Sequence, residues 1–356
     1  MRICRRESRE ASSFREVHRR TPQRHVTVTI AQTITSRLGR GTVSVAVSLL
    51  ILAVAAVLLY RLLHDVDFAK VVAAAEAQTL RKIAIASGFV IAGYVTLTFY
   101  DLFALRIIGR RKVPYSVAAL ASFTACTIGH SLGAAVLTGG LIRLRIYAVW
   151  GLTVLDVAKI ALVTGMTFWL GNALLLGGAT AYVPEAASAI DRLPASINRA
   201  IGLLGLLSIA GYLIWIALRP RAIGRSGWRL VLPNLRFTLL QIGIGALDLS
   251  LVTLAMYTLL PSDPAVDLPT VMVIFLTATL LGTASHAPGG LGVIEATVLL
   301  GLTQFAKEEL LAALLTFRAL YFVLPLCLAT LSLGLRELRM LAHPAVARCD
   351  GHDGDA

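Results

Sequence analysis

In the stretch TASHAPGGLGVIEATVLLGL, residues 283 to 302, helix-breaking and ionisable residues interrupt a hydrophobic segment. Pro288, Gly289, Gly290 and Gly292 interrupt a helix here, and a new half-helix can begin among them. The N–H groups at the start of a half-helix bind anions, and in a membrane a lipid phosphate is their natural occupant. Glu295 falls in the first turn, where it could meet a cation such as an amino headgroup, or cap its own helix beside a glycine hinge.

Other ionisable residues also interrupt hydrophobic segments. Asp248 and Arg318 each lie well inside an expected helix, where a charge costs about 2.5 to 3.5 kcal/mol on insertion scales. Both should therefore face the interior, as an ion pair with each other or as substrate contacts. Asp101 lies nearer the cytoplasmic end of its helix and could reach the interface or join the site. Arg143 and Arg145 follow a first glycine-rich break, where they could bind headgroup phosphate or serve only to keep their loop cytoplasmic.

Two histidines precede the glycine elements, His130 before the first and His286 before the second. Each could relay protons or form a packing hydrogen bond. The cysteines show no metal-ligand or disulfide spacing, and we expect neither a metal nor another cofactor. They are Cys4, Cys126, Cys327 and Cys349.

The composition is that of a membrane protein. Hydrophobic residues make up 57% of the chain, charged residues only 15%, and the mean hydropathy is +0.77. Such a balance is far from that of a soluble domain. A spanning helix needs about 20 apolar residues, because the hydrocarbon core is roughly 30 Å thick. Runs of this kind recur from residue 43 to residue 335, so the chain is predicted to be an all-α, polytopic membrane protein.

Six full spans are predicted, with residues 115–142 and 270–305 left unassigned. The spans are 43–61, 83–107, 157–183, 197–218, 235–260 and 310–335. Lys and Arg collect on cytoplasmic flanks, and they cluster in residues 1–40, 106–112, 143–145 and 219–229, so both termini are expected to be cytoplasmic. The segment 115–142 must then return to the side it entered, and it is too short for two crossings. It is expected to be a re-entrant hairpin, whereas 270–305 could be re-entrant or two short spans.

The two halves share an order of features that predicts an inverted repeat, 83–183 and 235–335. Asp101 is followed 38 residues later by Gly139-Gly140-Leu141, and Asp248 is followed 41 residues later by Gly289-Gly290-Leu291. The first hairpin is expected to enter from inside and the second from outside. Inverted repeats with helices broken near the bilayer midplane are the architecture of many transporters.

The net charge of +13 is concentrated at the N-terminus, where residues 1–40 hold ten Arg against three Glu. We interpret this segment as a basic, disordered cytoplasmic arm beside anionic lipid headgroups, and expect no nucleic-acid partner. The apolar segment after it is longer than that of a signal peptide, which favours an uncleaved first helix. The expected organisation is an arm over 1–40, one membrane domain over 41–340 and a polar cytoplasmic tail over 341–356.

Four segments together resemble the lysylphosphatidylglycerol synthetase transmembrane family, which includes the flippase domain of bacterial multiple peptide resistance factors. They are YDLFALRIIGR, GHSLGAAVLTGGLIRLRIYAVWGL, LGTASHAPGGLGVIEA and LTFRALYFVLPLCLA, within residues 80 to 340. The resemblance implies a membrane domain that moves aminoacylated phospholipid between leaflets beside a separate soluble synthetase domain. It assigns to the lipid pathway Arg143, Pro288, Gly289, Gly290, Gly292, Glu295 and Arg318. Only a short tail follows Arg339, so we expect no synthetase domain and no enzymatic activity.

The leading hypothesis is thus a translocase or lipid-handling transporter of the bacterial plasma membrane, acting on phospholipids with anionic or aminoacylated headgroups. Its expected partners are membrane lipids, with a separate synthetase or glycosyltransferase as a partner protein. One alternative is an ion- or proton-coupled transporter of a small polar solute, and another is a non-catalytic subunit of a system that modifies lipids or polyprenyl-linked glycans. We find no nucleophile elbow, HExxH or P-loop motif in the sequence that would support a catalytic role.

Overall fold

The computed structural model describes residues 67–132, 135–218, 222–225, 228–231 and 233–342. These residues all belong to the unit Ser48–Ala356. The basic arm over 1–40, the predicted span 43–61 and the tail from residue 343 lie outside them. Cys4 and Cys349 therefore lie outside the described part of the chain as well.

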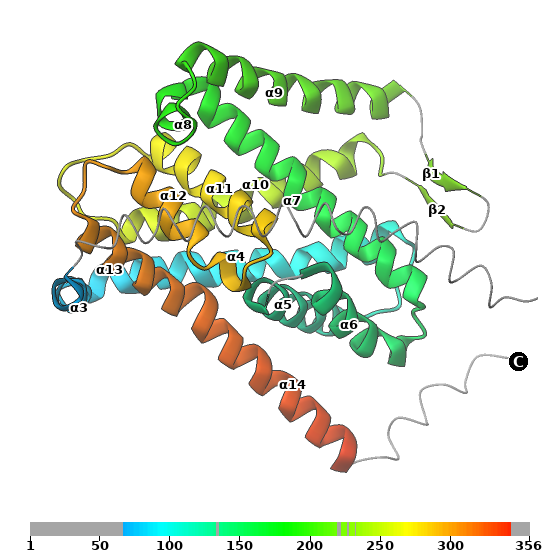
Figure 1. Cartoon of the computed structure of the whole chain (residues 1–356). Coiled ribbons are helices and arrows are strands. Elements are labelled where there is room, and N and C mark those ends of the chain that lie inside the picture. The colour runs from blue at the N-terminus through cyan, green and yellow to red at the C-terminus, as the bar shows by residue number, and fades with distance from the viewer. Residues whose placement is uncertain (1–66, 133–134, 219–221, 226–227, 232, 343–356) are drawn as a thin grey trace, which may run out of the picture. The chain divides into compact units, whose positions relative to one another are not determined.

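The described chain is helical, which confirms the predicted all-α membrane fold (Figure 1). Six of its helical segments are long and apolar enough to cross a bilayer. They are α4 (Leu80–Ile107), α7 (Val154–Tyr182), α9 (Ala195–Leu218), α10 (Leu235–Leu259), α11 (Leu268–Ser285) and the continuous run Lys307–Arg336. Five of these match predicted spans. The sixth, α11, lies in the segment that the sequence left unassigned.

The shorter elements lie between these helices or at their ends. α3 (Phe68–Glu76) precedes α4, η2 (Ala148–Trp150) precedes α7 and α8 (Pro184–Asp191) joins α7 to α9. Two short antiparallel strands, β1 (Ala222–Arg225) and β2 (Trp228–Val231), interrupt the basic segment between α9 and α10. The run Lys307–Arg336 consists of α13 (Lys307–Arg318), a π-helical turn η4 (Ala319–Val323) and the first part of α14 (Leu324–Ala342).

Polar caps fix where several long helices begin. The Thr153 side chain accepts a hydrogen bond from the Asp156 N–H, and the Asp156 carboxylate accepts one from the Thr153 N–H. The two bonds form a capping box at the start of α7. Asn234 accepts a hydrogen bond from the Phe237 N–H at the start of α10, and Asp267 accepts one from the Thr270 N–H at the start of α11. These side chains satisfy N–H groups that the first helical turn leaves without partners.

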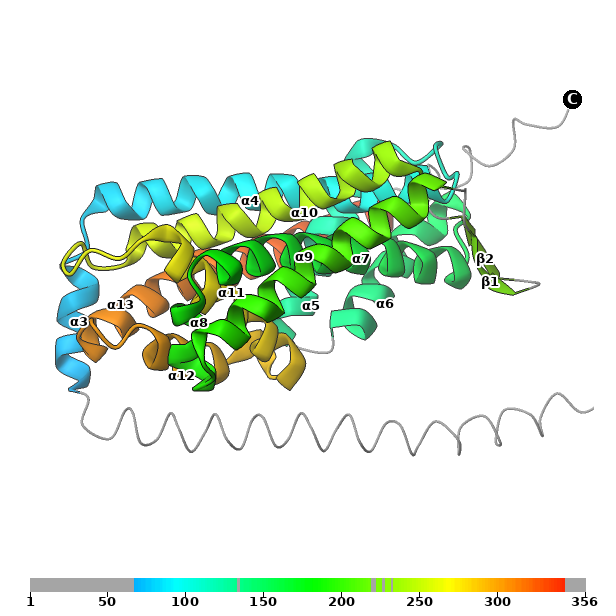
Figure 2. The same ribbon diagram turned by 90° about the horizontal axis from the view of Figure 1, so that it is seen from above.

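α10 packs against both α4 and α7, and Figure 2 shows it beside α4. The contact between α7 and α10 depends on Gly171 and Gly245, where an added Cβ would meet the backbone of the opposite helix. Small residues at such crossings let membrane helices approach until their backbones touch. α10 therefore sits between the two long helices of the first repeat.

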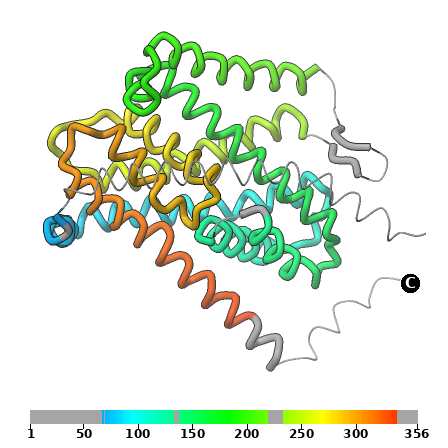
Figure 3. The backbone as a smooth tube through the Cα atoms, in the orientation of Figure 1, coloured from blue at the N-terminus to red at the C-terminus, as the bar shows by residue number. Residues whose placement is uncertain are grey.

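Two broken hairpins complete the domain. In the first, α5 (Tyr115–Leu132) packs against α6 (Ala135–Tyr147). In the second, α11 is followed by the 3-10 turn η3 (Pro288–Gly290) and by α12 (Val293–Gly301), a break that the tube in Figure 3 follows. α12 has 9 residues, which gives it a length of about 14 Å, too short to cross a bilayer. The second hairpin thus has one arm of spanning length and one short arm.

Along the chain, α4, α5–α6 and α7 are followed by α10, α11–α12 and α13–α14, so each half has a long helix, a broken hairpin and a further long helical segment. η3, at the tip of the second hairpin, contacts α5 of the first. The buried hydrophobic residues of the described chain form two clusters. One includes Met256, Ile274 and Leu314, and the other includes Leu105 and Ile160.

Candidate functional site

The first polar centre is a buried ion pair between Asp101 of α4 and Arg143 of α6. Arg143 Nε donates to Oδ1 at 3.1 Å and to Oδ2 at 2.9 Å, and its Nη2 donates to Oδ1 at 2.8 Å. Asp101 is 0% exposed and Arg143 is 5% exposed. Of the two alternatives for Asp101, the structure favours a place in a buried site, because Asp101 and Arg143 neutralise each other inside the protein.

Residues that the sequence analysis did not select complete this centre. The Tyr147 hydroxyl donates to Asp101 Oδ2 at 2.8 Å, and Arg143 Nη2 lies 3.6 Å from Cys126 Sγ. A Cβ added at Gly139 would lie 3.0 Å from the Ala125 carbonyl oxygen, so the glycine allows α6 to approach α5. The position of Tyr147, one helical turn after Arg143, was the signal available in the sequence.

The second polar centre joins α12 to the end of α13 through Glu295 and Arg318. Arg318 Nε donates to Glu295 Oε1, and Arg318 Nη1 donates to the Gly289 carbonyl oxygen at 3.0 Å. The guanidinium also lies over the Phe322 ring, 5.5 Å from its centroid. The expected pairing of Arg318 with Asp248 is therefore wrong, because the broken hairpin brings Glu295 to Arg318 instead.

The anion site expected at the start of the half-helix is partly filled by the protein itself. Glu295 Oε2 accepts a hydrogen bond from the Gly292 N–H at 2.8 Å, so this carboxylate caps its own helix as well as pairing with Arg318. The N–H groups of Gly290 and Leu291 donate to backbone carbonyls. Arg318 Nη2 remains available to an anion, because it is a buried nitrogen with no hydrogen-bond partner among the described residues.

The third polar centre is Asp248 on α10, which is 4% exposed. Its Oδ2 accepts a hydrogen bond from the Tyr100 hydroxyl of α4 at 3.1 Å. Its Oδ1 is buried without a hydrogen-bond partner among the described residues. This contact crosses from the second repeat to the first.

Among the remaining predicted residues, His130 lies within electrostatic reach of Arg143 in the first ion pair. Arg145 is exposed on α6, and His130 is exposed near the end of α5. His286 ends α11 in the left-handed region, with φ 55°, and its Nδ1 lies 3.0 Å from the Ala284 carbonyl oxygen. Among the described residues, no cluster of three or more His, Cys, Asp or Glu side chains has the arrangement of a metal site.

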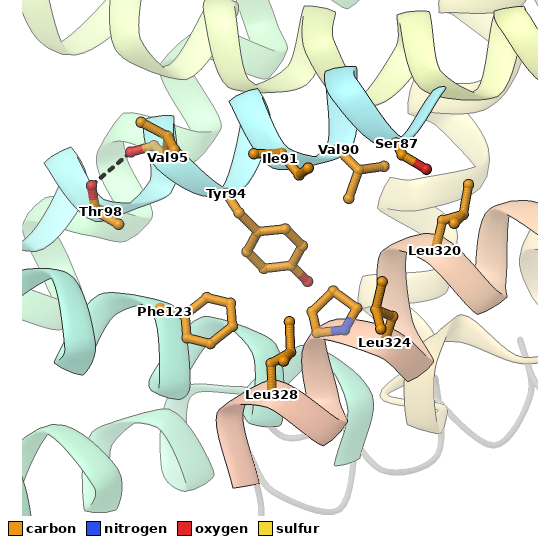
Figure 4. Close-up of a pocket in the computed structure, with 11 residues that line it drawn as sticks. Ser87, Val90, Ile91, Tyr94, Val95, Thr98, Phe123, Leu320, Leu324 and Leu328 are labelled. Carbon is orange, nitrogen blue, oxygen red and sulfur yellow. Dashed lines mark hydrogen bonds between the residues drawn. The ribbon is translucent and has the colours of Figure 1, made fainter. Parts of the chain in front are cut away.

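An apolar groove of about 360 Å³ opens between α4, α5 and the η4–α14 segment (Figure 4). In Figure 4 the Tyr94 ring lies between the two walls, and its hydroxyl donates to the Tyr321 carbonyl oxygen of η4 at 2.8 Å. The rest of the lining is almost entirely hydrophobic. It includes Val90, Ile91, Phe123, Leu320, Leu324 and Leu328.

No protein-family model matches the chain. An uncharacterized protein of Synechocystis sp., slr0712, is 33% identical over 280 residues, which cover 78% of this chain and 86% of that protein. The inner membrane protein YbhN of Escherichia coli is 31% identical over 260 residues, 71% of this chain and 79% of that protein. A phosphatidylglycerol lysyltransferase of Staphylococcus haemolyticus is 39% identical over 69 residues, 19% of this chain and 8% of that enzyme.

Proposed function

The chain belongs to the family of the inner membrane protein YbhN, and on this premise we propose that it is a lipid translocase of the bacterial inner membrane. It is an integral membrane protein with several helices of spanning length. The proposed substrates are phospholipids with anionic or aminoacylated headgroups. The similarity to a phosphatidylglycerol lysyltransferase over 69 residues supports this class, since that protein is named for a lysyl transfer to phosphatidylglycerol.

The observation that carries the proposal is the guanidinium of Arg318 at the break between α11 and α12. Its side chain is 13% exposed, and its Nη2 has no hydrogen-bond partner among the described residues. A buried donor without a partner costs about 1 to 3 kcal/mol, and more when charged, so a ligand that accepts this hydrogen bond gains affinity. Phosphate is the ligand that suits it, because guanidinium and phosphate form paired, charge-assisted hydrogen bonds.

Glu295 is the second charged residue of the proposed site. A phosphate that binds Arg318 competes with the Glu295 carboxylate, which then becomes available to an ammonium group. A lysyl-modified headgroup carries both a phosphate and ammonium groups, so it can replace the Arg318–Glu295 pair with two new pairs. An exchange of partners avoids leaving either buried charge alone, which is the costly arrangement in a membrane interior.

The groove supplies a place for the acyl chain. The segment that carries Arg318 continues through Leu320, Leu324 and Leu328, which line the groove. The outer surface beside it is hydrophobic, since Ile91 is 63% exposed and Leu324 is 53% exposed. A lipid could therefore place its headgroup near Arg318 while its tail stays in an apolar surrounding.

The proposal assigns no catalytic step to this chain. An aminoacylated lipid would come from a separate synthetase, and a glycosyltransferase is the corresponding partner if the lipid carries a glycan. We also propose that the N-terminus and the C-terminus are cytoplasmic, from the positions of the Lys and Arg clusters.

The test is lipid movement in liposomes that contain the purified protein. Fluorescent phospholipids with neutral, anionic and lysyl-modified headgroups are placed in the inner leaflet, and their arrival outside is followed by chemical quenching. We expect movement faster than in protein-free liposomes, with anionic or lysyl headgroups preferred. Arg318→Gln and Glu295→Gln should lower the rate, whereas Arg199→Gln, on the exposed face of α9, should leave it unchanged.

Folded protein that moves none of these lipids would refute the proposal. Equal rates in wild type and Arg318→Gln would remove Arg318 from the lipid path. A rate that falls equally in Arg199→Gln would point to general damage to the membrane domain instead of a loss at the site.

A further inference from the structure

Each repeat has an aspartate at a related position, and among the described residues only one of the two aspartates is paired with a cation. In the first repeat Arg143, four residues after Gly139, forms the ion pair with Asp101. In the second repeat the position four residues after Gly289 is Val293, a buried hydrophobic residue. Asp248 consequently lacks the cation that its counterpart has, and among the described residues it forms no ion pair.

The groups that surround Asp248 are uncharged at neutral pH. Tyr94 and Tyr100 face it from α4, Cys126 from α5 and Tyr321 from η4. The other described helices packed against α10, which are α7, α9, α11 and α13, bring no ionisable side chain into contact with it. Within the described ranges, Tyr100 supplies the one hydrogen bond that Asp248 accepts.

An ionised carboxylate is unfavourable in this setting because it is buried without a counter-charge. An ionised carboxyl group taken out of water without a counter-charge loses several kcal/mol of hydration, and it normally avoids that loss by taking up a proton. Protonation gives one oxygen an O–H and leaves the other to accept from Tyr100. Intramembrane carboxyl groups of this kind mark proton paths in pumps and transporters.

The surroundings of Asp248 also connect it to the proposed lipid path. Asp248 Oδ1 lies beside Gly93 of α4, where an added Cβ would be 3.8 Å away. The next residue, Tyr94, lines the groove and donates to the Tyr321 carbonyl oxygen in η4, three residues after Arg318. A carboxylate formed at Asp248 would draw water towards the α4–α10 interface, next to the contact that joins α4 to the Arg318 segment.

We infer that Asp248 is a proton-binding site of the membrane domain, and that its proton couples lipid movement to the transmembrane proton gradient. The coupling rests on the proposed translocase function, whereas the proton site itself does not. Asp101, which is also buried but is paired with Arg143, serves as the comparison within the same protein.

The first experiment uses dicyclohexylcarbodiimide, a hydrophobic reagent that modifies protonated carboxyl groups, on the full chain in liposomes at neutral pH, with the modified residues located by mass spectrometry. We expect Asp248 to be labelled and Asp101 not. Arg143→Met removes the counter-charge of Asp101 and should make that residue reactive, which controls for access of the reagent. Labelling of Asp101 in this variant without labelling of Asp248 would overturn the proton site.

Infrared spectroscopy gives a second measurement that does not depend on reagent access or on the Arg143 variant. The carbonyl band of a protonated carboxyl group should be present in wild type at neutral pH and be lost in Asp248→Asn. A spectrum in which Asp248→Asn removes only a carboxylate band would overturn the proton site.

The coupling is tested by lipid movement in liposomes with and without an imposed pH gradient. We expect the gradient to change the wild-type rate, Asp248→Asn to lose that response, and Asp248→Glu to keep it. A full response in Asp248→Asn would overturn the coupling. If no lipid moves in any variant, the translocase proposal fails, while labelling and infrared spectra still decide whether Asp248 holds a proton.

Discussion

Removing one partner of the Asp101–Arg143 pair should destabilise the protein more than removing both. Arg143→Met leaves a carboxylate that is 0% exposed and keeps, among the residues that the structure describes, one hydrogen-bond donor, the hydroxyl of Tyr147. Breaking a buried ion pair in this way costs about 3 to 5 kcal/mol, because the remaining carboxyl group must either stay charged without a partner or take up a proton. Asp101→Asn leaves the buried guanidinium without its counter-charge and should cost a similar amount.

The double variant Asp101→Asn with Arg143→Met buries no charge. Its loss should be smaller than that of either single variant, since replacing a whole buried pair by neutral groups is often close to neutral. The Arg110–Asp156 pair provides the control, because Arg110 is 45% exposed there. Arg110→Gln should cost no more than about 1 kcal/mol, the usual worth of an exposed ion pair.

The assay is unfolding of the purified protein in mixed micelles by a denaturing detergent, followed by tryptophan fluorescence. Free energies of unfolding for the four variants and wild type give the coupling between Asp101 and Arg143. Losses that simply add in the double variant, or an Arg143→Met loss no larger than that of Arg110→Gln, would refute the argument that burial makes this pair interdependent.

Three further outcomes are expected. Gly245→Ala brings its methyl group against the backbone of α7 and should destabilise the protein by about 1 to 3 kcal/mol in the same unfolding assay. Gly243→Ala is the control, because a Cβ there meets open space, and it should be neutral or stabilising. Arg318→Lys should slow lipid movement as much as Arg318→Gln, because an ammonium cannot reproduce the planar fork that donates to a carboxylate and a carbonyl at once; wild-type rates would contradict this. Leu328→Trp should narrow the groove and slow lipid movement. Leu331 is exposed on α14 outside the groove lining, so Leu331→Trp should not slow it. Equal rates for the two variants would exclude the groove as the path of the acyl chain.

The sequence by itself determined the class of protein and most of its helices. Apolar length is a local property, so it predicted five of the spans that the structure describes, and the Pro-Gly-Gly-Leu-Gly stretch predicted the break before α12. It did not identify α11 as a helix of spanning length. The sidedness of the flanking loops left residues 270–305 open between a re-entrant hairpin and two short spans, whereas the structure forms one continuous helix from Leu268 to Ser285.

Only the tertiary structure decided which charges pair. Asp101 pairs with Arg143, 42 residues later, and Glu295 pairs with Arg318, 23 residues later. Within the described part of the chain, Asp248 accepts a hydrogen bond from Tyr100 and has no counter-charge. Membrane helices are hydrophobic on nearly every face, so their pattern does not reveal which face turns inward or which neighbour it meets. The partners are set by helix packing, including the close crossing of α7 and α10 and the meeting of the two hairpins, and packing between distant segments leaves little trace in the local sequence.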